Sequence, residues 1–206
     1  MVHGWCGTPN MGWYVWLEKE LENRGFKAHT LFMPNPDEPE IEPWIACLEK
    51  TVGTLNENTY FVGHSVGCQT ILRYISRNSS ARVGGVVCVA GWFVLKDLES
   101  ENEWEVARPW LVPRSLWDIT RPFFKEEWSI AKKWLDERIP LDKLDGRLNL
   151  VAIFSDNDPY VPVEPNKTMF ENIGAKTIVL PKMCHLAEDD YDELPVVLEE
   201  LLEMIK

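Results

Sequence analysis

The residues Gly63-His64-Ser65-Val66-Gly67 stand between an apolar run at 59–62 and a second one at 68–75. They spell G-x-S-x-G between a predicted strand and a predicted helix, which is the setting of a nucleophile elbow. A serine on such a sharp turn has a strained backbone, and glycine two residues before and after it removes side chains that would collide there. The amides at the start of the following helix favour negative charge nearby. We therefore interpret Ser65 as a candidate nucleophile.

Apolar runs and amphipathic segments alternate along the rest of the chain. Strands are predicted at 26–32, 59–62, 83–90, 148–154 and 176–180, and helices at 11–24, 43–52, 68–75 and 194–205. The runs at 83–90 and 148–154 are almost continuously apolar, as expected of parallel strands that are buried on both faces. This alternation indicates an α/β fold with a doubly wound, mostly parallel sheet and helices on both faces. A length of 206 residues suits a single domain, 1–206.

The segment 92–147 interrupts this alternation. It carries six of the ten tryptophans, at positions 92, 104, 110, 117, 128 and 134, together with Phe93, Phe123 and Phe124. We interpret it as a cap-like insert over the strand ends that lines an apolar substrate pocket. The alternative is that these aromatic side chains only pack the insert against the body of the domain.

Charge and cysteine content exclude several classes of function. The formal net charge of −12 argues against binding to nucleic acid or to an anionic membrane, and it disfavours polyanionic substrates. The sequence shows no signal peptide and no run long enough to cross a membrane. Five scattered cysteines without a C-x-x-C pair indicate reduced thiols and no zinc site. We expect a cytoplasmic protein without metal or other cofactor.

A serine nucleophile needs a base, and the base needs an acid to orient it. In hydrolases built on this elbow, the three residues follow in the order Ser, Asp, His on loops after strands. His185 is the only one of the four histidines that follows the loop after the strand 148–154, and that loop offers Asp156 and Asp158. We prefer Asp158 as the acid and predict the triad Ser65, Asp158 and His185. His64 is expected to point away from the active face.

An oxyanion hole needs two N–H donors near the serine. We predict the backbone amides of Val66, which follows the nucleophile, and of Trp5, because His3-Gly4-Trp5 resembles the H-G element of such loops. The predicted substrate contacts are His3, Gly4, Trp92, Phe93 and Tyr160.

Motifs along nearly the whole chain are similar to one known family. They are His3-Gly4-Trp5, Gly12-Trp13-Tyr14-Val15-Trp16-Leu17, Met33-Pro34-Asn35-Pro36, Gly63-His64-Ser65-Val66-Gly67, Asp158-Pro159-Tyr160-Val161-Pro162 and Cys184-His185. In these the chain resembles the small serine hydrolases typified by retinoblastoma-binding protein nine, within the α/β-hydrolase superfamily. The resemblance implies a compact hydrolase sheet whose triad acts on ester or amide bonds without a metal.

The chain departs from that family in three respects. Only Met1-Val2 precedes the His3 loop, where the family has a central strand, so we expect a truncated first strand and a poorly anchored oxyanion loop. The insert at 92–147 is longer than the family's crossover, so the size of the substrate cannot be transferred. Ile45-Ala-Cys47-Leu-Glu49 is similar to the L-x-C-x-E segment that binds the retinoblastoma protein, but we interpret the similarity as a coincidence in a core-facing helix.

The leading hypothesis is a serine hydrolase that cleaves a carboxylic ester or amide of a small, apolar or aromatic substrate through an acyl-enzyme on Ser65. One alternative is a catalytically weak or inactive hydrolase fold that serves as a protein-binding module, with the aromatic side chains of the insert as its interface. Another is different chemistry on the same triad, such as a lyase, but no lysine is placed to support it.

Overall fold

The computed structural model describes residues 1–78, 80, 82–96, 129–144, 146–187 and 191–206. Its strands are β1 (Tyr60–His64), β2 (Gly85–Val89), β3 (Leu150–Ser155) and β4 (Lys176–Leu180). Its helices are α1 (Gly12–Glu22), α2 (Ile41–Val52), α3 (Val66–Arg77), α6 (Val163–Asn172) and α7 (Pro195–Met204), with a short 3-10 helix η2 (Leu141–Lys143). Residues 129–136 are also helical.

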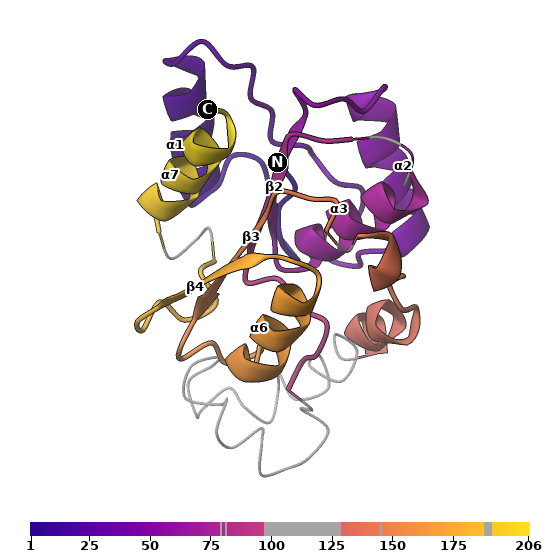
Figure 1. Ribbon diagram of the computed structural model, residues 1–206. Helices are drawn as coiled ribbons and strands as arrows, with labels where there is room; N and C mark the ends of the chain where they lie inside the picture. The colour runs from indigo at the N-terminus through magenta and orange to yellow at the C-terminus, as the bar shows by residue number, and fades with distance from the viewer. Residues whose placement is uncertain (79, 81, 97–128, 145, 188–190) are drawn as a thin grey trace.

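The four strands form one parallel sheet in the order β1-β2-β3-β4. Helices α1 and α7 lie on one face, and α2, α3 and α6 lie on the other (Figure 1). The predicted doubly wound α/β fold is therefore confirmed. Helix α6 was not predicted, although Asn166 and Phe170 recur at helical spacing on its buried side.

Val2 extends the sheet beyond β1. It forms parallel bridges to Leu31 on one side and Gly63 on the other. Its N–H donates to the carbonyl of Val62 at 2.9 Å, and its carbonyl accepts from the His64 N–H at 3.1 Å. The predicted strand at 26–32 is reduced to the single bridge at Leu31, so that prediction was wrong for the other residues. The expectation of a poorly anchored loop at His3 was also wrong, because Val2 is fully buried and paired on both sides.

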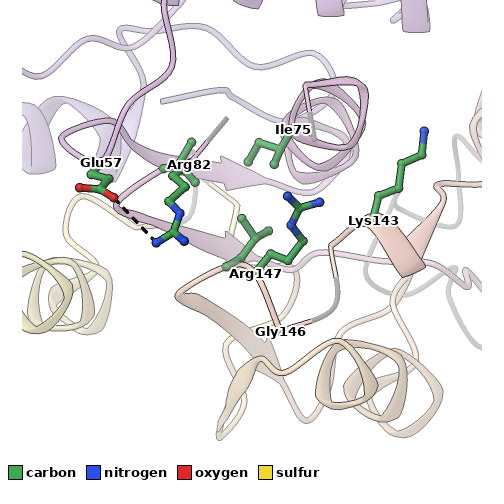
Figure 2. A pocket seen from close by; sticks show the side chains of 8 residues that line it. Glu57, Ile75, Arg82, Lys143, Gly146 and Arg147 are labelled. Carbon is green, nitrogen blue, oxygen red and sulfur yellow. Dashed lines mark ion pairs between the residues drawn. The ribbon is translucent and has the colours of Figure 1, made fainter. Parts of the chain in front are cut away.

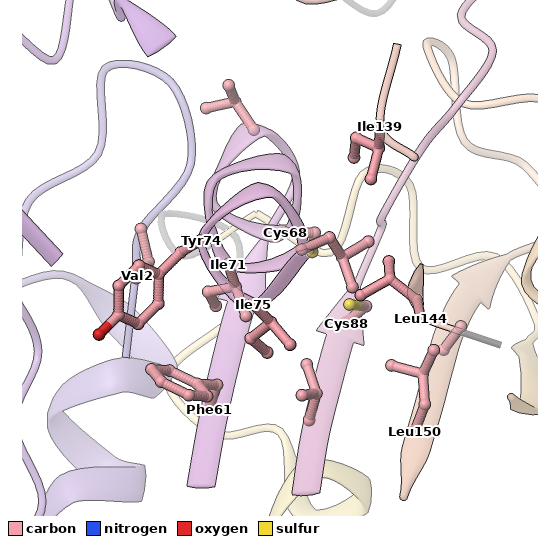
Figure 3. Close-up of a cluster of buried hydrophobic side chains, with 14 of the residues drawn as sticks. Val2, Phe61, Cys68, Ile71, Tyr74, Ile75, Cys88, Ile139, Leu144 and Leu150 are labelled. Atoms are coloured by element: carbon pink, nitrogen blue, oxygen red, sulfur yellow. The ribbon is translucent and has the colours of Figure 1, made fainter. Parts of the chain in front are cut away.

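Alternation along the strands divides the core into two layers. Val86 and Cys88 of β2 belong to the layer under α2 and α3, which Figure 3 shows, while Val87 and Val89 belong to the layer under α1 and α7. Successive side chains of a strand point to opposite faces, so a continuously apolar strand serves both layers. This is why the apolar runs of β2 and β3 predicted parallel strands correctly.

Backbone rules explain where the helices begin and end. Pro43 lies in the first turn of α2, where the missing N–H removes no intrahelical hydrogen bond, and Pro195 opens α7 in the same way. Gly53, with φ +66°, ends α2 in a conformation that other residues rarely adopt. These helices begin within two residues of the predicted positions.

The end of the predicted insert packs against the body of the domain. The indole N–H of Trp134 donates to the Pro39 carbonyl at 2.9 Å, and its ring meets Trp44 edge-on at 6.1 Å. The Arg73 guanidinium, buried on α3, donates to the carbonyls of Trp134 and Glu137. For Trp134, therefore, the structure shows the alternative in which the aromatic side chain packs the insert against the body of the domain. Residues 97–128 of the cap predicted at 92–147, with Trp104, Trp110, Trp117, Trp128, Phe123 and Phe124, lie outside the described residues.

Replacing Arg73 by methionine tests this anchor, and Arg77→Met is a matched control one turn later on α3. Arg73→Met leaves the carbonyls of Trp134 and Glu137 without this donor. We expect it to lower the free energy of unfolding by about 2–4 kcal/mol. Arg77 makes exposed ion pairs with Glu42 and Glu137, and its replacement should cost less than about 1 kcal/mol. Urea unfolding measures both, and equal losses would contradict the anchor.

Candidate active site

The predicted catalytic residues lie at the carboxyl end of the parallel sheet. Ser65 follows β1, Asp158 lies on the loop after β3, and His185 lies on the loop after β4. Because all four strands run the same way, these three loops leave the sheet at one edge. Asp158 and His185 lie 93 and 120 positions after Ser65 in the sequence, and they can therefore meet it there. The spacing of neighbouring strands sets the distance between them.

Ser65 is held in a strained turn with φ +50° and ψ −118°. Its N–H donates to the Val89 carbonyl of the adjacent strand at 2.9 Å. A Cβ added to Gly63 would lie 2.8 Å from the Cys68 amide nitrogen, and one added to Gly67 would lie 2.3 Å from the Val2 carbonyl oxygen. Both glycines of the elbow are thus required by close backbone contacts, one with helix α3 and one with the first residues of the chain.

The three side chains form one hydrogen-bonded chain. His185 Nε2 lies 3.0 Å from Ser65 Oγ, and His185 Nδ1 lies 2.8 Å from Asp158 Oδ2. A carboxylate can only accept, so we assign the proton to Nδ1, which leaves the Nε2 lone pair facing the serine hydroxyl. In this arrangement Nε2 can take the serine proton as the hydroxyl attacks a carbonyl carbon.

The environment of Asp158 keeps its carboxylate ionised. Burial by itself would raise the pKa of this carboxyl. The neighbouring His185 and the N–H donors of Val161 and Tyr160, at 2.9 and 2.8 Å from Oδ1, outweigh burial and hold the pKa below its ordinary value. A permanent acceptor therefore faces His185 Nδ1 at neutral pH.

Asp156, the alternative acid, has another partner. It is exposed, and its Oδ1 accepts from the Lys182 N–H at 2.7 Å. Two neighbours that the sequence analysis did not single out make similar bonds: Ser155 Oγ accepts from the Met183 N–H and Asn157 Oδ1 from the Cys184 N–H, each at 2.8 Å. The loop after β3 thus holds the loop of His185 through three consecutive side chains. For these contacts between the two loops, the signal available in the sequence was a run of polar residues directly after a predicted buried strand.

The two predicted oxyanion donors are the amides of Val66 and Trp5. Val66 is the first residue of α3, where an N–H has no intrahelical acceptor. Within the described parts of the chain, neither this amide nor that of Trp5 donates to a protein acceptor. The Gly4 backbone packs so closely on His64 that an added Cβ would lie 2.5 Å from its Nδ1. Glycine at this position lets the Trp5 loop approach the elbow.

Most predicted substrate contacts lie below the surface. His3 is fully buried, accepts from the Met33 N–H at 3.2 Å and lies 2.8 Å from the Gly4 carbonyl. Trp92 is buried, and the half-buried ring of Phe93 packs against Phe170 at 4.7 Å. The ring of Tyr160, by contrast, meets His185 edge-on at 5.1 Å. Of the predicted substrate contacts, Tyr160 therefore has its ring directly beside His185.

His64 was expected to point away from the active face, and the structure places its side chain against the loop that carries His185. It is buried, and its ring lies 5.0 Å from the ring of His185. Its Nε2 lies 2.9 Å from the His185 carbonyl oxygen, which can only accept, so Nε2 carries the proton.

A separate hollow lies at the opposite end of the sheet. It is lined by Glu57, Ile75, Arg82, Val83, Lys143, Gly146, Arg147 and Leu148, and Arg82 pairs with Glu57 at 3.9 Å (Figure 2). These residues precede β1, β2 and β3 or close α3, whereas the triad follows the strands. The hollow is therefore not part of the triad site.

Two other kinds of feature are absent from the described residues. There, no group of three or more His, Cys, Asp or Glu side chains is arranged to hold a metal ion. In the same part of the chain, no helix combines the length and the apolar character needed to cross a bilayer.

Comparison with known proteins agrees with this geometry. A family model described as serine hydrolase matches residues 1–203. The chain is 28% identical over 203 residues to YdeN of Bacillus subtilis (strain 168), provisionally named a hydrolase, and the match covers 98% of this chain and 92% of YdeN. The crystal structure of the ydeN gene product superposes with a TM-score of 0.77 at 25% identity, covering 99% of this chain and 96% of that one.

A more distant structure supports the fold alone. Est1E from Butyrivibrio proteoclasticus superposes with a TM-score of 0.64 at 16% identity, covering 99% of this chain and 86% of its own. Together the comparisons confirm the predicted α/β-hydrolase fold and the predicted superfamily. The narrower likeness to retinoblastoma-binding protein nine stays a prediction.

The lowered pKa of Asp158 makes a prediction about stability in acid. A carboxyl whose folded-state pKa lies below its ordinary value of 3.8 stabilises the fold above that value, and loses this contribution as pH falls through the folded-state pKa. Asp158→Asn removes the group. We expect the difference in unfolding free energy between wild type and this variant to narrow between about pH 5 and pH 2. Urea unfolding over this range tests it, and a difference independent of pH would contradict it.

Proposed function

The chain belongs to the serine hydrolase family, and from that premise we propose that it cleaves a carboxylic ester or amide through an acyl-enzyme on Ser65. The observation that carries the proposal is the continuous hydrogen-bonded chain from Ser65 Oγ through His185 to Asp158, with distances of 3.0 and 2.8 Å. A module that only binds a protein has no need for this arrangement, so these hydrogen bonds favour an enzyme over a protein-binding module.

The proposed reaction begins with attack by Ser65 Oγ on the substrate carbonyl carbon, while His185 Nε2 takes the hydroxyl proton. The Asp158 carboxylate stabilises the imidazolium that forms. Collapse of the tetrahedral intermediate breaks the bond to the leaving group, which receives the proton from His185. Water then attacks the acyl-enzyme with His185 again as the base, and the acid product leaves with Ser65 restored.

The backbone N–H groups of Val66 and Trp5 are assigned the stabilisation of the negative charge on the tetrahedral intermediate. Val66 N–H points from the start of α3, where the helix dipole also favours an oxyanion. The Trp5 amide belongs to a loop that is fixed by the buried ring of His3 and by the Trp5 indole N–H, which donates to the Asp37 carbonyl at 2.9 Å. Donors held in place before the reaction are the effective ones, because they need no reorganisation as charge develops.

The proposed substrate is small and apolar or aromatic. The Tyr160 ring beside His185 supplies aromatic surface next to the reacting atoms. A formal net charge of −12 disfavours polyanionic substrates. Both features support an uncharged ester or amide.

A fluorophosphonate probe tests the nucleophile, because it forms a covalent bond only with an activated serine. We expect the probe to label wild type and Ser76→Ala, a control serine on α3 whose hydroxyl donates to the Arg73 carbonyl. Ser65→Ala should not be labelled, and intact-protein mass spectrometry measures the adduct. A folded wild type that stays unlabelled, or labelling of Ser65→Ala, would contradict the proposal.

The acid is tested by a matched pair of substitutions in one loop. Asp158→Asn removes the acceptor that fixes the tautomer of His185, and we expect kcat for a p-nitrophenyl ester to fall about 10³- to 10⁴-fold. Asp156→Asn keeps a side-chain oxygen that can accept from the Lys182 amide and leaves Asp158 in place, so the loss should stay below about tenfold. Comparable losses in the two variants would show that Asp158 is not the orienting acid.

A further inference from the structure

The loop that carries His185 has an unusual backbone. Lys182, Cys184 and Leu186 all have left-handed φ values, of +56°, +46° and +55°. Residues other than glycine rarely adopt this conformation, and they keep it only where the surroundings hold them. His185 is therefore presented from a strained segment, and its position depends on what holds that segment.

The first half of the loop is held by the side chains after β3. Lys182, Met183 and Cys184 donate their backbone N–H groups to Asp156, Ser155 and Asn157. These bonds end immediately before His185.

The second half is held from beneath by two N–H donors from other parts of the chain. His64 Nε2 donates to the His185 carbonyl at 2.9 Å, and Trp13 Nε1 donates to the Leu186 carbonyl at 3.2 Å. His64 ends β1, immediately before the nucleophile, and Trp13 lies in the first turn of α1.

These two donors support each other and are closed to substrate. Trp13 is fully buried and His64 is 2% exposed. Their rings meet edge-on at 6.3 Å and 89°. His64 also packs against the Gly4 backbone of the oxyanion loop and against the ring of His185. The imidazole of His64 thus contacts both the oxyanion loop and His185, and His64 directly precedes Ser65 in the sequence.

We propose that His64 and Trp13 are positioning residues, whose N–H groups hold the His185–Leu186 backbone so that His185 Nε2 stays on Ser65 Oγ. This inference rests on the proposed function for its catalytic consequence, but the holding of the loop is a property of the fold by itself. Small displacements of a catalytic group cost about 10²-fold in rate, so the loss should fall on kcat, while KM changes little.

The test compares variants that remove a donor with variants that keep it or lie beside it. His64→Leu removes the imidazole N–H, and His64→Gln keeps an amide N–H of similar reach. Trp13→Phe removes the indole N–H but keeps an aromatic ring, and Trp16→Phe is its control on the same helix, where Trp16 is only partly buried. We expect kcat for a p-nitrophenyl ester to fall about 10- to 100-fold in His64→Leu and about tenfold in Trp13→Phe. His64→Gln should recover most of the loss, and Trp16→Phe should change little.

A double-substitution cycle separates positioning from general damage. If His64 acts through His185, His64→Leu should cause no further loss of kcat in the His185→Ala background. A further loss in that background, or a loss that falls on KM alone, would overturn the proposal.

Hydrogen–deuterium exchange of the segment 181–187 gives a readout that does not need activity. We expect faster exchange in His64→Leu and Trp13→Phe than in wild type or Trp16→Phe. Unchanged exchange would overturn the positioning role whether or not the enzyme is active. A wild type that neither turns over esters nor reacts with the fluorophosphonate, yet shows the expected exchange differences, would contradict the proposed function and leave the positioning role supported.

Discussion

The strained turn at Ser65 is the constraint on which the rest of the site depends. A residue with φ +50° stays there only if its neighbours leave no easier conformation. Here the neighbours are backbone: Gly67 lies against the Val2 carbonyl, and Gly63 lies against the first turn of α3. Close contact between three backbone segments fixes the direction of the Ser65 hydroxyl. The same contact brings the oxyanion loop, which begins directly after Val2, to the elbow.

Three histidines gather around this turn, and their hydrogen-bond partners divide their roles. The buried rings of His3 and His64 each direct an N–H to a backbone carbonyl, an arrangement that a neutral imidazole satisfies. His185 instead faces the carboxylate of Asp158, which can stabilise an added positive charge. In the proposed reaction, the positive charge of a proton taken from Ser65 is therefore stabilised at His185, which has a carboxylate partner. The other two serve as fixed parts of the scaffold.

The proximity of Ser65, Asp158 and His185 could be predicted from the sequence because chain order and strand direction together determine it. Once Ser65, Asp158 and His185 each follow an apolar run, a parallel sheet brings them to one edge. The anchoring of Val2 and the position of His64 could not be predicted in this way. Both depend on contacts between segments about 30 to 120 residues apart, of a kind that local pattern does not encode. In the predicted strand 26–32, Leu31 bridges Val2 and the His29 carbonyl accepts from the Met1 N–H, a limited pairing that alternation alone did not reveal.

The exposed acidic side chains lie farther from the site than the backbone N–H groups within it, and the two act on it with different strength. Most acidic side chains among the described residues are exposed, where water and salt weaken their effect on the site. Within the site, the N–H groups of Tyr160 and Val161 donate to Asp158, and in the proposed reaction those of Val66 and Trp5 stabilise the oxyanion. Asp158 can thus remain ionised although it is buried, and an oxyanion can form next to Ser65 although the molecule is acidic. Short-range dipoles fixed by the fold, rather than net charge, therefore set the chemistry of this site.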